Sequence, residues 1–178
     1  NRIKDTRLLA VEKDTDKRYS GKRSWEFDVK QQGWRYHMNN IMAAIGSEQL
    51  KRFPELARKR QTLAKYYDSL FENNKQQILP LIIDYETVVP HIYTVRTKGI
   101  RDRKLLRQYL LEKGIQTGVH YQPNHSLSYF HRDSEFSLPI TESIFPELLS
   151  LPLHPDLSER DLEFVVATLV DNVKKDCE

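Results

Sequence analysis

The side chains that could do chemistry gather in two segments of the sequence, residues 33–40 and 118–131. The first segment places a glycine, two aromatic residues and a cluster of polar residues directly before a run of small residues. That order is typical of a turn that faces a cofactor or a substrate. The second segment contributes three histidines: His120, His125 and His131. Both segments are therefore candidates for a binding site.

A metal site at these histidines is not expected. They follow one another at intervals of five and six residues, with Asp133 beyond them, whereas zinc sites use tighter local spacing with a glutamate or cysteines. Pro123 also prevents His120 and His125 from forming a helical pair. His91 and His154 each lie beside a proline, so we expect them to be structural.

Residue chemistry alone gives no complete catalytic set. The six glycines are not clustered, so there is no glycine-rich phosphate loop, and no Gly-x-Ser-x-Gly elbow occurs. The single cysteine, Cys177, cannot form an internal disulfide, which fits a reducing compartment such as the cytoplasm. We do not expect this cysteine to be a nucleophile.

Composition and charge exclude some classes of protein. The net charge of +3 over 178 residues is too small to argue for a nucleic-acid partner. No apolar run approaches the length of a membrane span. Residues 1–32 are too polar to fold alone, and we expect a solvated loop lying on another domain or a partner chain rather than a nucleic-acid arm. A basic face at 58–65 is also expected to be solvated.

Hydrophobic spacing predicts the elements that must position the two polar segments. A helix is expected through Met38, Ile41, Met42 and Ile45, a second from Pro54 to Leu70, strands at 78–83 and 91–95, a helix through 105–110, a strand at 115–121 and a final helix after Ser158. Strands interleaved with helices predict an α+β fold, in which helices cover one face of a small sheet.

Several helix ends can be predicted from their capping residues. Asn39 or Asn40 is expected to cap the first helix, and Gly114 to end the helix through 105–110. Ser158 with Asp161 resembles a capping box for the final helix. Leu157 and Leu162 are placed for the hydrophobic staple that often accompanies such a box.

The segment Gly33-Trp34-Arg35-Tyr36-His37-Met38 resembles the Gly-aromatic-Asn-Tyr-Arg-Met turn of the DegT/StrS-type nucleotide-sugar aminotransferases, which are pyridoxal phosphate (PLP) enzymes of fold type I. The resemblance continues in the same order through residues 40–50, 90–93, 114–121 and 149–155. It covers nearly the whole chain.

The resemblance implies a division of the chain and a reaction. Residues 1–52 would be the tail of the large PLP-binding domain, and residues 53–178 the small C-terminal α+β domain. The intact enzyme would transfer an amino group, from glutamate, to a keto-sugar nucleotide. The lysine that forms an imine with PLP is expected upstream of Asn1, because no lysine in residues 1–32 has a suitable setting. The chain alone is therefore expected to be inactive.

The resemblance also implies roles for individual residues. Arg35 stands where many members have Asn and is expected to reach the PLP phosphate of the neighbouring subunit in a homodimer. His37 stands where Arg is common and is expected to contact the sugar nucleotide. His120, Tyr121 and His125 are expected on the substrate side of the site. For Trp34 and Tyr36 we favour packing. No membrane or nucleic-acid partner is expected.

Two other functions remain open at this point. Some relatives carry histidine in place of the lysine and act as PLP- or PMP-dependent sugar dehydratases, and only the upstream residue distinguishes them. A non-enzymatic module that binds through the basic face at 51–65 is the third reading. A truncated product that only dimerises or misassembles is also open, since its uncovered face would associate.

Overall fold

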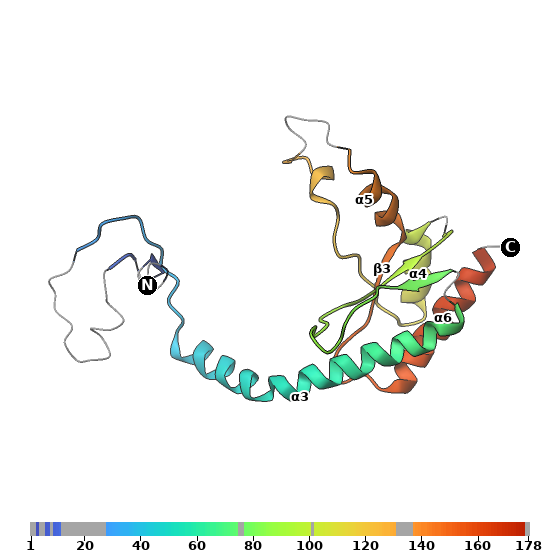
Figure 1. Cartoon of the computed structure of the whole chain (residues 1–178), viewed down its shortest axis with the longest axis horizontal. Helices are drawn as coiled ribbons and strands as arrows, with labels where there is room; N and C mark the ends of the chain where they lie inside the picture. Colours follow the sequence, from blue (N-terminus) through green and yellow to red (C-terminus); the bar gives the residue numbers. More distant parts are fainter. Residues whose placement is uncertain are drawn as a thin grey trace. The chain divides into compact units, whose positions relative to one another are not determined.

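The computed structural model describes residues 3, 6, 7, 9–11, 28–74, 77–100, 102–130 and 137–176. The helices are α3 (Asn40–Phe71), α4 (Arg103–Glu112), α5 (Pro139–Ile144) and α6 (Glu159–Asp176), and the strands are β1 (Ile78–Pro80), β2 (Tyr93–Thr97) and β3 (Leu148–Leu151) (Figure 1). Three short 3₁₀ turns are η1 (Glu72–Asn74), η2 (Asn124–Ser126) and η3 (Phe145–Glu147). The expectations for residues 12–27, His131, Asp133 and Cys177 lie outside the described residues.

The three strands form one antiparallel sheet in the order β1-β2-β3. Successive side chains of a strand point to opposite faces, so the register assigns each pair to a face. The pair Tyr93 and Leu151 lies on the same face as the next-but-one pair of Val95 and Leu149. The alternate face carries the polar pair Thr94 and Ser150. One face of the sheet is thus apolar, and the other carries hydroxyl groups.

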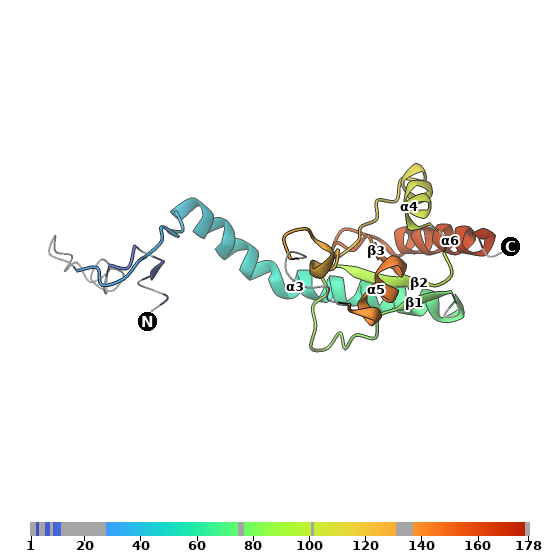
Figure 2. The ribbon, with the colours of Figure 1, turned by 90° about the horizontal axis from the view of Figure 1, so that it is seen from above.

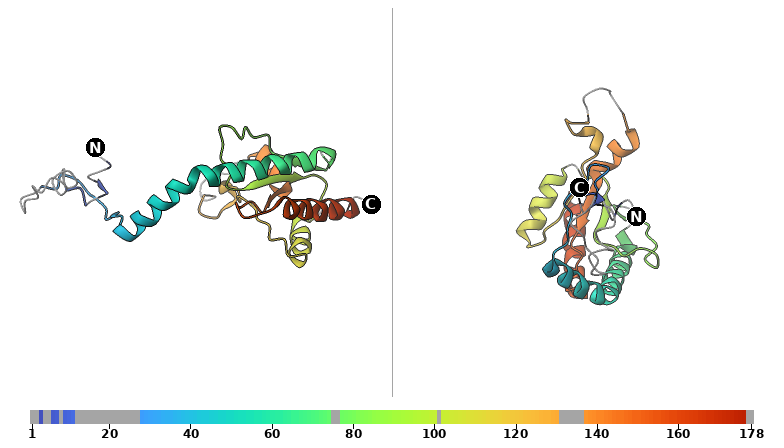
Figure 3. Two further views of the ribbon diagram at one scale, coloured as in Figure 1. Left: turned by 90° about the horizontal axis from the view of Figure 1, so that it is seen from below. Right: turned by 90° about the vertical axis from the view of Figure 1, so that its left-hand side faces the viewer.

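Helices cover the apolar face. The ring of Tyr93 stacks on the ring of Tyr67 from α3 at a centroid distance of 4.5 Å, and Phe71 stacks beside both. From α6, Leu162 and Leu169 are fully buried in the same core. Figures 2 and 3 show the second half of α3 and α6 running side by side along one side of the sheet. The α+β prediction is confirmed by this arrangement.

The prediction of two separate helices before the sheet is wrong. One helix runs from Asn40 to Phe71 with Pro54 inside it. Proline removes one helical hydrogen bond, but the helix continues because its later turns bury a stripe that includes Leu63 and Tyr67. Of the two candidate caps, Asn39 is the one that acts, since its Oδ1 accepts from the Met42 N–H at 2.8 Å.

The other two predicted helix ends are confirmed. After α4, Gly114 has a φ of +81°, and the N–H groups of Gly114 and Ile115 donate to the carbonyls of Leu111 and Leu110. Before α6, the Ser158 N–H donates to Asp161 Oδ2 at 2.8 Å and the Asp161 N–H to Ser158 Oγ at 3.3 Å. This is the reciprocal capping box.

The strand predictions are right in part. The strand expected at 115–121 is reduced to one isolated bridge between Gly118 and Ser150. The third strand is instead β3, which follows η3 directly and was not predicted. Its four residues are too few to show a period, and pairing with β2 is what makes them a strand.

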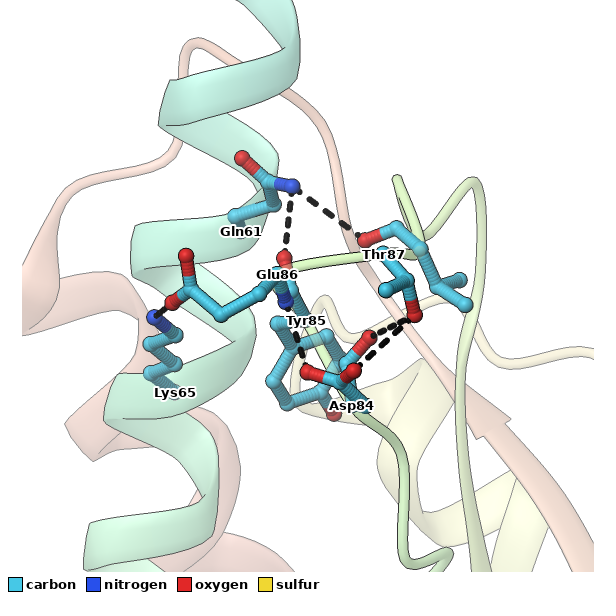
Figure 4. A network of polar contacts seen from close by, with 7 residues as sticks. Gln61, Lys65, Asp84, Tyr85, Glu86 and Thr87 are labelled. Carbon is cyan, nitrogen blue, oxygen red and sulfur yellow. Dashed lines mark hydrogen bonds and ion pairs between the residues drawn. The ribbon is translucent and has the colours of Figure 1, made fainter.

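The basic face of α3 is not only solvated, as was expected, because two of its cations bond to neighbouring backbone carbonyls and to a carboxylate. Arg60 Nη1 donates to the carbonyls of His91 and Leu153 at 3.2 and 2.9 Å. Lys65 Nζ forms an ion pair with Glu86 Oε1 at 2.5 Å (Figure 4). The helix therefore fastens the connection between β1 and β2.

A second group of contacts on this connection is centred on Gln61 (Figure 4). Gln61 Nε2 donates to the carbonyls of Tyr85 and Val88 at 2.6 and 3.3 Å. Asp84 closes the turn by accepting from the Glu86 N–H at 2.9 Å and the Thr87 hydroxyl at 3.0 Å. The segment that leads into β2 is thus held by both α3 and its own turn.

The chain divides into two compact units, Asn1–Arg52 and Phe53–Glu178. The assignment of the first unit to the tail of a larger cofactor-binding domain stays a prediction. No helix in the described part of the chain has both the length and the apolar character needed to cross a membrane.

Candidate functional site

His120 lies against the hydroxyl-bearing face of the sheet. The backbone bridge places Gly118 opposite Ser150, with the Gly118 N–H donating to the Ser150 carbonyl at 2.9 Å and the Ser150 N–H donating back at 2.8 Å. His120 Nδ1 lies 2.9 Å from the Ser150 hydroxyl. The imidazole covers Gly118 so closely that an added Cβ there would lie 2.6 Å from His120 Cε1. The sheet and the glycine together fix the half-buried ring.

Tyr121 extends the ring surface that His120 begins. The two rings meet edge to face, with centroids 4.9 Å apart and an interplanar angle of 85°. Tyr121 is 71% exposed, so its ring offers apolar area and its hydroxyl a hydrogen bond to a molecule from solvent. The structure thus brings two of the predicted substrate-side residues together.

His125 is held separately from this pair. It lies in η2, and its Nε2 is 3.2 Å from Glu142 Oε1 of α5. The same carboxylate accepts from the Leu138 N–H at 2.8 Å, at the start of α5. The hydrogen bond to Glu142 therefore connects η2 to α5, and the structure gives no contact between His125 and His120.

Arg35 and His37 lie in the other unit, on the turn before α3. Both side chains are exposed and make no hydrogen bond or ion pair with the residues that the structure describes. The turn itself is fixed by its backbone, because the Trp34 N–H donates to the Thr6 carbonyl at 2.8 Å and the Tyr36 N–H to the Arg7 carbonyl at 2.9 Å. The guanidinium of Arg35 remains available to an anion.

The packing favoured for Trp34 and Tyr36 is not what the structure shows. Trp34 is half exposed and Tyr36 is 69% exposed, because no described residue covers the outer side of the turn. Both rings line a cavity of about 490 Å³ beside it. The other lining residues are Ile3, Thr6 and Arg7.

These residues fit one part of a PLP site. Arg35 can donate paired, charge-assisted hydrogen bonds to a phosphate. Within the described ranges, no lysine side chain is buried where it could meet the aldehyde of the cofactor. The described residues can therefore anchor a phosphate but do not form a pocket for the ring.

Within 28–74, 77–100, 102–130 and 137–176, no three His, Cys, Asp or Glu side chains lie close enough together to hold an ion. His125 and Glu142 form a pair without a third member there.

Two functional residues were not predicted from the sequence: Thr94 and Ser150, whose hydroxyls lie behind His120. Their Oγ atoms lie 3.2 Å apart, and both residues are buried. A signal for Ser150 was present, since a lone hydroxyl interrupts the apolar run of β3. Its partner in β2 could not be identified before the register was known.

Comparison with known proteins gives a consistent result. The family model of the DegT/DnrJ/EryC1/StrS aminotransferases matches residues 1–170. A curated relative, the UDP-4-amino-4,6-dideoxy-N-acetyl-beta-L-altrosamine transaminase of Campylobacter jejuni, is 29% identical over 86% of this chain and 42% of its own length.

Two solved structures share the fold. PseC of Helicobacter pylori, an aminotransferase involved in the biosynthesis of pseudoaminic acid, matches with a TM-score of 0.83 and 25% identity over 97% of this chain and 45% of its own. Spr1654 of Streptococcus pneumoniae in its PLP form matches with a TM-score of 0.81 and 28% identity over 97% of this chain and 43% of its own. The chain spans less than half the length of each of these relatives.

Proposed function

Because the chain belongs to the DegT/DnrJ/EryC1/StrS aminotransferase family, we propose that the intact protein is a PLP-dependent enzyme that transfers an amino group, from glutamate, to a keto-sugar nucleotide. The family match over residues 1–170 carries this proposal. The Campylobacter jejuni relative supports the substrate class, since its name describes a transaminase of a UDP-sugar. The fold type I relationship of the described units agrees with it.

PLP, when bound, supplies the electron sink for the reaction, and the protein supplies binding and orientation. In this proposal Arg35 holds the phosphate of the cofactor, and His37 contacts the sugar nucleotide. Both side chains are exposed on a turn whose backbone is fixed. A cation held ready on a rigid turn loses little freedom on binding an anion.

The second unit supplies the substrate side in this proposal. The exposed ring of Tyr121 provides a wall, His120 beside it provides a polar contact, and His125 acts at the edge where η2 meets α5. These groups bind and exclude water. In this proposal the lysine that moves the proton at the substrate carbon lies upstream of Asn1, in the large domain.

The active form in this proposal is a homodimer with a shared site. Four apolar side chains at helical spacing are all more than half exposed: Met38 just before α3, and Ile41, Met42 and Ile45 in its first turns. An apolar stripe of this kind gains about 25 cal/mol for each Å² removed from water. A second subunit that covers it would also bring Arg35 near the neighbouring cofactor.

The proposal is tested on the full reading frame that contains this chain. The protein is purified with PLP, reduced with borohydride, and digested, and mass spectrometry locates any lysine that carries the cofactor. The expected result is one labelled lysine in the large domain, together with release of 2-oxoglutarate when glutamate and a keto-sugar nucleotide are supplied.

Two other results would contradict the proposal. Bound cofactor without a labelled lysine would indicate the sugar dehydratase reaction instead. Failure to bind PLP at all would exclude both enzymes and leave a binding module, for which salt-dependent affinity for duplex DNA is the direct assay.

A further inference from the structure

The environment of His120 contains a short chain of hydroxyl groups. Thr94 Oγ1 lies 3.2 Å from Ser150 Oγ, and Ser150 Oγ lies 2.9 Å from His120 Nδ1. Thr94 is 8% exposed and Ser150 3% exposed. Each hydroxyl has one proton to donate, so the direction of the two hydrogen bonds follows from counting donors and acceptors.

In one direction every hydroxyl proton has an acceptor. Thr94 donates to Ser150, Ser150 donates to Nδ1 of His120, and the imidazole then carries its proton on Nε2. In the other direction Nδ1 donates to Ser150, Ser150 donates to Thr94, and the Thr94 proton has no acceptor among the described residues. A buried donor without an acceptor costs about 1–3 kcal/mol, so the first direction is favoured.

The opposite side of the ring is accessible. His120 Nε2 has no hydrogen-bond partner among the described residues, and it is not one of their buried unpartnered atoms. Tyr121, which touches the ring edge to face, is exposed on the same segment. A ligand that reaches Tyr121 can therefore also reach Nε2.

We propose that Thr94 and Ser150 hold neutral His120 in the tautomer with the proton on Nε2, so that the ring donates a hydrogen bond to an acceptor oxygen of the sugar nucleotide. Thr94 and Ser150 are then positioning residues. The identity of the acceptor rests on the proposed function, but the tautomer does not. A histidine fixed in this way selects oxygen acceptors and disfavours donors such as the substrate amine.

Solid-state NMR on the intact protein with ¹⁵N-labelled histidine rings tests the tautomer at pH 8. The His120 signals are identified by their absence in His120→Asn. The nitrogen that lacks a proton resonates far downfield of the nitrogen that carries one, and we expect Nδ1 to be the downfield signal. A protonated Nδ1 in the wild-type protein would overturn the inference, whatever the enzyme's activity.

Ser150→Ala tests the cause. It leaves the backbone bridge to Gly118 in place and removes the partner of Nδ1, so both tautomers should appear. Thr97→Val is the matched control, because Thr97 carries another buried hydroxyl of β2, which donates to the Glu147 carbonyl away from His120. It should leave the His120 signals unchanged. If folded Ser150→Ala still showed only the Nε2–H tautomer, the hydroxyl pair would not be what fixes the tautomer of His120.

Steady-state kinetics tests whether His120 contacts the sugar nucleotide, separately from its tautomer. Ser150→Ala should raise KM for the sugar nucleotide about five-fold, with kcat and the KM for glutamate near wild type. An unchanged KM for the sugar nucleotide, in a variant with mixed tautomers, would overturn the contact with the substrate. An intact protein that shows the Nε2–H tautomer and transfers no amino group would instead contradict the proposed function alone.

Discussion

At the scale of single residues, the arrangement around His120 depends on the absence of a side chain at Gly118. The imidazole occupies the space that a side chain at position 118 would take, and this lets Nδ1 reach the Ser150 hydroxyl. His120 and Gly118 are close together in the sequence, but the position of the ring over the glycine depends on the Gly118 to Ser150 bridge, which joins positions far apart in the chain.

Gly118→Ala should displace the His120 ring while leaving the fold intact. The new Cβ would lie 2.6 Å from His120 Cε1, so the ring must move and its hydrogen bond to Ser150 is lost. We expect about a five-fold rise in KM for the sugar nucleotide, which corresponds to one hydrogen bond of about 1 kcal/mol. Kinetics and thermal melting measure the two effects, and Gly46→Ala, where an added Cβ meets nothing, is the control.

Tyr85 makes the protein sensitive to alkaline pH. Its hydroxyl is buried and has no hydrogen-bond partner among the described residues, and burial, followed by the charge of Asp68, raises its pKa to about 12. An unfolded tyrosine loses its proton near pH 10. Between these values the folded state binds more protons, so the free energy of unfolding falls as pH rises from 10 to 12.

Tyr85→Phe should therefore be neutral or stabilising at pH 8, since it removes an unpartnered buried hydroxyl, and should lose less stability than wild type at pH 11. Urea unfolding at the two pH values measures this. Tyr129→Phe, with an exposed ring, is the matched control. Equal losses at pH 11 for wild type and Tyr85→Phe would show that Tyr85 does not contribute.

At the scale of elements, residues close in the sequence predicted helix ends correctly, whereas strand pairings could not be predicted. The end of α4 at Gly114 and the capping box of α6 follow from side chains a few residues apart, so the sequence alone predicts both. Strand β3 and the bridge at Gly118 require partners distant in the chain. The continuity of α3 through Pro54 was missed for a similar reason, because burial of later turns outweighs the local cost of proline.

Arg60 should matter more to stability than its neighbours on α3. It is half-buried and donates to two carbonyls, those of His91 and Leu153, whereas Arg58 is exposed. Arg60→Ala should lower the free energy of unfolding by about 1–3 kcal/mol, and Arg58→Ala by less than about 0.5 kcal/mol. Denaturant unfolding of the two variants compares them, and equal effects would contradict the role given to Arg60.

At the scale of the whole molecule, the exposed apolar stripe at the start of α3 indicates association. The described residues leave it uncovered, and the chain spans less than half of the relatives that it matches. A homodimer with a shared site is the assembly that we propose for the intact protein. In that proposal both units contribute to the site, Arg35 and His37 from the first and His120, Tyr121 and His125 from the second.

Ile41→Glu should weaken that dimer at least about ten-fold, or 1.4 kcal/mol, because it places a charge in the proposed interface. The loss should be accompanied by weaker PLP binding. Leu105→Glu is the control, since Leu105 is equally exposed but lies on α4. Sedimentation equilibrium gives the dimer constants, and a dimer that tolerates Ile41→Glu as well as Leu105→Glu would place the interface elsewhere.

The backbone bridge between Gly118 and Ser150 closes a long excursion of the chain at its base. The described part of the segment that carries Tyr121, His125 and α5 leaves the sheet at Gly118, opposite Ser150, and leads back into β3. Insertions, deletions and exchanges within a segment whose ends already meet cost little in loop-closure entropy. The excursion could therefore be exchanged as a unit while the sheet and the helices α3 and α6 that cover it stay the same.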